Sequence, residues 1–105
     1  MTKYFMPEEN PHNAYYVKLV NYQDIPGFHH HGGSLILIQS GLLNMEYDEY
    51  LRMCRDIFHG ELYGKNFVYP TVQFKNKCDA YALCDLLNPV MDMYVKYRES
   101  LNDWN

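Results

Sequence analysis

The sequence has few cysteines, and none of them is spaced for a zinc ribbon or finger. Its 105 residues contain three cysteines, Cys54, Cys78 and Cys84, without a C-x-x-C pair among them. An odd number of isolated cysteines argues against a disulfide framework of the kind that stabilises small secreted folds. We therefore predict a reducing, cytoplasmic setting.

Long apolar runs are missing as well. No stretch approaches the roughly 18 residues that a membrane-spanning helix needs. Residues 1–10 also lack the basic and then apolar pattern of a signal peptide. The sequence thus predicts no membrane association, and it predicts a protein that is soluble and either untargeted or targeted by a partner.

Basic residues are fewer than acidic residues in this sequence. Nine basic against thirteen acidic residues give a formal net charge of −4. This sign disfavours binding to nucleic-acid phosphates, so the sequence predicts a protein partner in preference to nucleic acid. The mixture of basic and aromatic side chains around Phe74, Lys75 and Lys77 is too small to reverse that balance.

Catalytic and nucleotide-binding motifs are absent from the sequence. It has no P-loop, dinucleotide-binding fingerprint, EF-hand loop or G-x-S-x-G nucleophile elbow. Cys78 lies in the first turn of an expected helix but near its apolar face, and Cys54 lies within an apolar stripe. Both thiols are therefore expected to be buried and inert. We predict neither a cofactor nor an enzymatic activity.

A run of three histidines at residues 29–31, followed by two glycines, is the one cluster of potential metal ligands. In an extended segment His29 and His31 would point the same way, and with Asp24, His12 or His59 alongside they could bind zinc or a similar metal. The spacing matches no known metal-binding motif, so an exposed polar loop is the preferred interpretation.

Tyrosine is the residue type in marked excess, with 11 copies. Its side chain offers a large contact area and a polar tip at low cost in conformational entropy, which suits a binding surface. A coding bias toward AT-rich codons explains the excess equally well. A tyrosine-rich interface is therefore one of two open interpretations.

The clearest predicted element is an amphipathic helix from Asn44 to His59. Its apolar residues recur at offsets of 0, 3, 4, 7, 10 and 11, and the opposite face is charged. Asn44 suits the N-cap, and Gly60 suits the end of the helix. The apolar stripe consists of Tyr47, Tyr50, Leu51, Cys54, Ile57 and Phe58. We expect this helix to pack as a core element.

The N-terminal part of the chain predicts an arm, a strand and a loop in that order. Residues 1–13 contain Pro7 and Pro11, which favours an extended or flexible arm over any regular element. Residues 14–22 alternate in hydrophobicity and predict a half-buried strand. Residues 23–33 carry Pro-Gly and Gly-Gly pairs and predict a loop.

Two further strands are predicted on either side of the amphipathic helix. Residues 34–39 contain four consecutive apolar residues, which predicts a central strand covered on both faces, with Leu37 fully buried. Residues 67–74 are rich in β-formers but contain Pro70. Because proline cannot donate a ladder hydrogen bond, this strand is expected at a sheet edge.

The last predicted element is a helix from about Lys77 to Leu101. Pro89 lies inside it and predicts a kink or two abutting helices. The residues expected to face the sheet gather on one side of the helical wheel. They are Ala82, Leu83, Leu86, Val90, Met93, Tyr94, Tyr97 and Leu101.

This order of elements, strand, strand, helix, strand, helix, predicts an α+β fold. A small, three-stranded and mostly antiparallel sheet would carry both helices on one face, which makes a two-layer domain. We expect residues 1–105 to form this single domain, because a chain of this length supports one modest core.

A second apolar stripe on the last helix lies about 140° from the expected core face and is edged by acidic residues at seven-residue intervals. An apolar centre with a charged rim is typical of a protein contact. The residues of this predicted partner-binding seam are Cys84, Met91, Val95, Asp85, Asp92, Glu99 and Tyr81. The seam predicts a homodimer or the binding of another protein.

The preferred hypothesis for function is a non-enzymatic, small protein-binding module that acts through tyrosine-rich and acidic surface. Its size and composition suit the inhibitors or adaptors that phages and mobile elements direct at host proteins. A small metal-dependent enzyme or metal sensor using residues 29–31 is the alternative function. Single-stranded nucleic-acid binding through exposed tyrosines is a weaker alternative.

Overall fold

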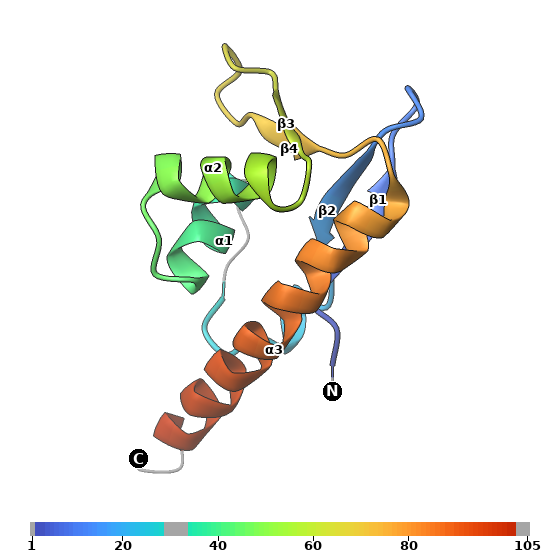
Figure 1. The fold of residues 1–105 in the computed structure, drawn as a ribbon. Coiled ribbons are helices and arrows are strands. Elements are labelled where there is room, and N and C mark those ends of the chain that lie inside the picture. The colour runs from blue at the N-terminus through green and yellow to red at the C-terminus, as the bar shows by residue number, and fades with distance from the viewer. Residues whose placement is uncertain (1, 29–33, 103–105) are drawn as a thin grey trace.

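The computed structural model describes residues 2–28 and 34–102. The elements in this part of the chain are β1 (Phe5–Glu9), β2 (Tyr15–Leu19), the short 3-10 helix η1 (Tyr22–Asp24), α1 (Leu35–Leu42), α2 (Tyr47–Asp56), β3 (Glu61–Tyr63), β4 (Thr71–Gln73) and α3 (Lys77–Asn102). They form a small α+β fold, as predicted. The molecule is elongated, 46 × 26 × 24 Å, and α3 runs along most of its length (Figure 1).

The N-terminal hairpin holds a strand where the sequence predicted an arm. β1 pairs antiparallel with β2, and Pro7 lies opposite Val17. Pro7 is tolerated because β2 is the one sheet neighbour that the described residues provide for β1, so the missing N–H can face away from the ladder. The Oδ1 atom of Asn10 accepts a hydrogen bond from the N–H of Ala14 at 3.1 Å and closes the turn.

The apolar run at residues 34–39 begins helix α1, so the predicted central strand is wrong. The hydroxyl of Ser34 accepts a hydrogen bond from the N–H of Leu37 at 3.4 Å and caps the helix. Four consecutive residues cover most of a helix's circumference, so at least one of them must face outward. Leu37 does so and is 58% exposed, while Ile36 is buried.

The predicted amphipathic helix is present as α2, with different ends. Tyr50 and Cys54 of its apolar stripe are fully buried, whereas Ile57 lies beyond the helix and is exposed. Glu46 stands at the N-cap, and Asn44 occupies a left-handed turn after α1. The hydroxyl of Tyr50 donates a hydrogen bond to the side chain of α1 residue Gln39 at 2.6 Å, which joins the two helices inside the core.

The described residues form two separate two-stranded sheets rather than the predicted three-stranded sheet. β3 pairs antiparallel with β4, and Pro70 precedes β4 instead of lying in its ladder. One isolated bridge connects the two hairpins: the N–H of Tyr15 donates to the carbonyl of Phe74 at 2.8 Å, and the N–H of Phe74 donates to the carbonyl of Tyr15 at 2.7 Å. The hairpin β3–β4 therefore lies across one end of the molecule (Figure 1).

Helix α3 packs mainly with another face than the one predicted, although Leu83, which was expected in the core, is buried. Cys84, Met91 and Val95, expected on the surface, are 2%, 3% and 4% exposed. Met93 and Tyr97, expected in the core, are 70% and 60% exposed. α3 has apolar residues around most of its circumference, so periodicity alone leaves two faces to choose from. The face that is buried includes small side chains, which let the hairpin β1–β2 approach closely.

The side chain of Asn88 forms hydrogen bonds that connect β1 and the preceding residue to the middle of α3. Its side-chain oxygen accepts hydrogen bonds from the N–H groups of Tyr4 and Phe5 at 2.9 and 2.8 Å. Its amide nitrogen donates to the carbonyl of Phe5 at 3.0 Å. The helix continues without interruption through Pro89, so the alternative of two abutting helices is wrong, and the expected kink stays a prediction.

Candidate protein-binding surface

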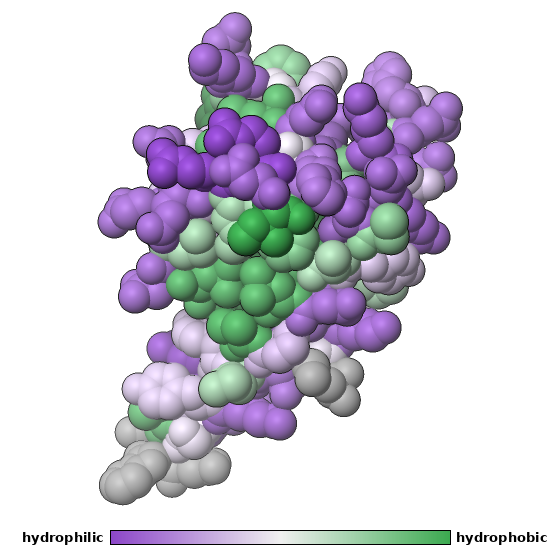
Figure 2. Space-filling model, viewed as in Figure 1, coloured by the Kyte–Doolittle hydropathy of each residue, from purple (hydrophilic) through white to green (hydrophobic). Residues whose placement is uncertain are grey.

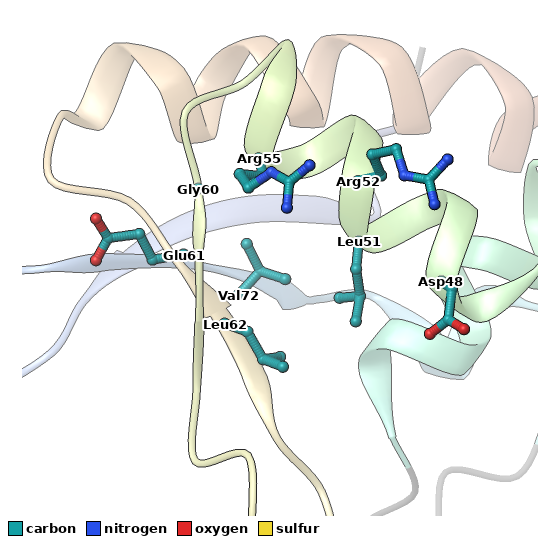
Figure 3. A pocket seen from close by; sticks show the side chains of 8 residues that line it. All are labelled: Asp48, Leu51, Arg52, Arg55, Gly60, Glu61, Leu62 and Val72. Carbon is teal, nitrogen blue, oxygen red and sulfur yellow. The ribbon is translucent and has the colours of Figure 1, made fainter.

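A groove of about 410 Å³ lies between α2 and the β3–β4 hairpin (Figure 3). Its apolar floor is formed by Leu51 of α2 and by Leu62 and Val72, which are cross-strand partners in the hairpin. Residues directly opposite each other in an antiparallel pair place their side chains on the same face, so Leu62 and Val72 reach the groove together.

Gly60 lets the start of β3 approach Val72 of β4 and Phe74 closely. A Cβ atom at this position would lie 2.6 Å from Cγ1 of Val72 and 2.8 Å from Cε1 of Phe74. Neither distance is compatible with a real side chain, so a larger residue would force the start of β3 away from β4. The sequence suggested Gly60 as the end of the preceding helix, but the left-handed residue there is His59.

Charged side chains surround the apolar floor of the groove. Arg52 and Arg55 project from α2 along one side, and Asp48 and Glu61 lie at its two ends (Figure 3). The Nε atom of Arg55 bonds to Oδ1 of Asp56 at 2.8 Å, and this contact lowers the pKa of the Asp56 carboxyl. Arg52 forms no ion pair with any described residue, although its charge also helps to lower the pKa of Asp56, so its guanidinium can bind a further carboxylate.

The end of β3 and the segment that joins it to β4 expose a group of large apolar side chains, which we call the aromatic loop. Its members Tyr63, Phe67, Val68 and Tyr69 are 50%, 62%, 84% and 53% exposed. The rings of Tyr63 and Phe67 meet edge to face, with centroids 6.0 Å apart. Gly64, at φ 74°, provides the turn that brings these rings together. The loop projects from the end of the molecule (Figure 1).

A hydrophobic area also lies on the middle of one face, over α1 and α3 (Figure 2). It includes a hollow of about 270 Å³ to which α1 contributes Ile38 and Leu42, and α3 contributes Met91 and Tyr94. Among the described residues, none that lines this hollow is charged, and the hydroxyl of Tyr94 is a side-chain polar group there.

The predicted partner-binding seam on α3 is divided by the fold. Its apolar centre, Cys84, Met91 and Val95, belongs to the core and is not available to a partner in this structure. The remaining members stay on the surface: Tyr81 lies 5.7 Å from the ammonium of Lys77, and Asp92 pairs with Lys96 at 3.1 Å. Asp85 and Glu99 are exposed. A partner-binding role for these four residues stays a prediction.

The opposite side of α3 exposes an apolar stripe that the sequence assigned to the core. Leu86, Met93, Tyr97 and Leu101 are 37%, 70%, 60% and 39% exposed, and the half-buried Val90 lies between the first two. Leu86, Val90, Met93 and Tyr97 follow the alternating steps of four and three residues that characterise helix-pairing seams. We call these five residues the α3 stripe.

The histidines of the predicted metal loop, His29 and His31, lie outside the described residues. Within residues 2–28 and 34–102, no group of three His, Cys, Asp or Glu side chains is arranged to hold a metal ion. His59, a suggested additional ligand, lies 3.4 Å from the carboxylate of Asp79. The metal hypothesis therefore gains no ligand set from the described part of the chain.

Two of the three cysteines have unreactive surroundings. Burial raises the pKa of the Cys54 thiol to about 11 and that of the Cys84 thiol to about 12. Such thiols are almost entirely protonated near neutral pH, and the thiolate is the nucleophile. Cys78 is exposed, contrary to the prediction that it is buried. All three are free.

Comparison with known proteins gives no relationship from which a function can be transferred. No protein-family model, curated protein or solved structure matches this chain. No helix in the described part of the chain is both long and apolar enough to cross a membrane. The local chemistry of the surface is therefore the basis for a functional proposal.

Proposed function

We propose that the chain is a non-enzymatic protein-binding module and that the aromatic loop is its main contact surface. The observation that carries this proposal is the exposure of Tyr63, Phe67, Val68 and Tyr69 on one projecting hairpin. Apolar surface in water costs about 25 cal/mol per Å², so covering these side chains with a partner would contribute substantially to affinity. Tyr and Phe are also enriched at the centres of protein interfaces.

The edges of the aromatic loop suit a protein better than a small molecule. The shallow hollow beside it, about 230 Å³, is lined by Tyr16, Tyr63, Phe67 and Tyr69 together with polar side chains. Phenol hydroxyl groups provide hydrogen bonds at the rim while their rings supply apolar contact. The three free cysteines support a reducing, cytoplasmic setting, in which such a module would act as an inhibitor or adaptor of another protein.

Replacing Phe67 and Tyr69 together by serine is expected to abolish capture of the partner. The double substitution removes two large exposed rings and leaves the buried residues in place, so the fold is expected to persist. Affinity capture from extracts of the native host, quantified by mass spectrometry, measures the effect. Proteins that require the loop should fall at least about tenfold in yield, the loss expected when interface hot spots are removed.

A double substitution away from both the aromatic loop and the α3 stripe, Leu37→Ser with Ile57→Ser, provides the matched control for this experiment. It also removes two well exposed apolar side chains, but from another surface. The proposal requires that this control capture the same proteins as the wild type. An equal capture profile for the loop variant and the wild type would contradict it.

Self-association through the α3 stripe is a second candidate, favoured by the heptad-like spacing of its exposed residues. In a two-fold dimer each copy would place Met93 near the shared axis or beside its counterpart. Met93→Glu is then expected to convert a dimer to a monomer, because like charges would meet across the contact. Sedimentation velocity over a range of concentrations measures the oligomeric state. A wild type that remains monomeric at every concentration would rule out the dimer.

A further inference from the structure

The outer edge of β3 has no strand beside it among the described residues. β3 pairs with β4 on one side, and all three of its residues are exposed. An unpaired edge presents backbone N–H and C=O groups at the spacing that an extended peptide requires. Recognition of this kind, in which a peptide adds a strand to a sheet, obtains affinity from the backbone and specificity from pockets for alternate side chains.

The groove beside α2 lies where such a peptide would direct its side chains. Gly60, Glu61 and Leu62 line the groove on the β3 side (Figure 3). Paired residues of adjacent strands share a face, so a peptide residue opposite Leu62 would point toward the floor made by Leu51, Leu62 and Val72. The peptide residue two positions away would point the same way, because side chains alternate along a strand.

The charges around the groove favour an acidic residue at that second position. Arg52 and Arg55 line the α2 side, and Arg52 has no ion-pair partner among the described residues. A guanidinium binds a carboxylate through two parallel hydrogen bonds, which adds both strength and direction. Asp48 at one end of the groove repels a further carboxylate there, whereas the Glu61 side chain points away from the floor (Figure 3), so the acidic residue belongs beside the two arginines.

We propose that the groove between α2 and β3 binds an extended segment of a partner protein by strand addition to β3. The segment carries an apolar residue, any residue and then an acidic residue, read in either direction along the groove. This inference rests on the proposed function, that of a protein-binding module, but assigns it a second contact of defined chemistry next to the aromatic loop.

Selection of short linear peptides from a random phage-displayed library, with the intact protein as target, tests the pattern. The expected result is enrichment of sequences with an apolar residue two positions from an aspartate or glutamate. Synthetic copies should lose at least about tenfold in affinity for Arg52→Glu, since the substitution replaces an attraction by a repulsion. Lys75→Glu makes the same change of charge at an exposed position outside the groove and should leave affinity within about twofold.

Methylation of backbone nitrogens in a selected peptide tests strand addition itself. Alternate N–H groups of a bound strand face β3, and the others face solvent. Methylating one alternate set should abolish binding, whereas methylating the other should be tolerated. Equal effects of the two sets, or undiminished binding to Arg52→Glu, would overturn the proposal.

The outcomes for the two proposals are separable. A library that yields no binders, or only binders without the apolar and acidic pattern, would rule out the groove as a peptide site. Loss of captured proteins from the Phe67 and Tyr69 double variant would still support the aromatic loop. Conversely, peptides that carry the apolar and acidic pattern and depend on Arg52 for binding would support the groove as a peptide site. This holds even if the Phe67 and Tyr69 double variant captured every partner normally.

Discussion

Met91→Glu is expected to destabilise the protein by more than about 4 kcal/mol, which is a large fraction of the stability of a domain this small. Met91 is 3% exposed and belongs to the core that α3 shares with the rest of the fold. A glutamate there would either bury an unpaired carboxylate or become protonated, and both outcomes oppose folding. Denaturation by urea, followed by circular dichroism, measures the loss.

The same substitution two residues further along the helix provides the control. Met93 is 70% exposed, so Met93→Glu should change the free energy of unfolding by no more than about 0.5 kcal/mol. The comparison is made at a protein concentration at which the wild type is monomeric, so that self-association does not contribute. Similar stabilities for the two variants would show that the face of α3 has been assigned wrongly.

Asn88→Ala is expected to cost about 3 kcal/mol or more, because it removes three buried hydrogen bonds at once. The N–H groups of Tyr4 and Phe5 would lose their common acceptor, and the carbonyl of Phe5 would lose its donor. A buried group without a partner costs about 1–3 kcal/mol. Exposure of the β1 amides should rise in parallel, which hydrogen exchange detects.

An asparagine that makes no such contacts serves as the reference for this variant. Asn66 is exposed in the segment between β3 and β4, so Asn66→Ala should have an effect of no more than about 0.5 kcal/mol. If Asn88→Ala were as mild, the bonds from Asn88 to β1 would contribute little to stability, and hydrophobic packing alone would hold the strand in place.

Local patterns in the sequence predicted some elements well. Helix α2 has a complete signature, an apolar stripe opposite a charged face, and both of its fully buried residues, Tyr50 and Cys54, were expected in the core. The same method failed at residues 34–39, where an unbroken apolar run fits either a buried strand or a helix. It also failed at β1, since Pro7 is unfavourable in most strands but acceptable at an edge.

The candidate site depends on contacts between distant segments, which local patterns do not encode. Two such contacts lie next to the groove: Gly60 is closely packed against Val72 and Phe74, and the bridge from Tyr15 to Phe74 connects the two hairpins. The excess of tyrosine was a signal for a binding surface such as the aromatic loop, but residues 67–74 were predicted as a strand. For α3, the wheel identified two apolar faces, and the position of β1–β2 decides which one is covered.

The attachment of β1 to Asn88 also sets an order of events during protein synthesis. The bonded residues are separated by 84 and 83 positions in the chain. A ribosome must therefore make the chain as far as Asn88 before the backbone of Tyr4 and Phe5 can meet its partner, and until then water must satisfy those N–H groups. The hairpin β1–β2 is thus fixed in place only after this part of α3 has been made.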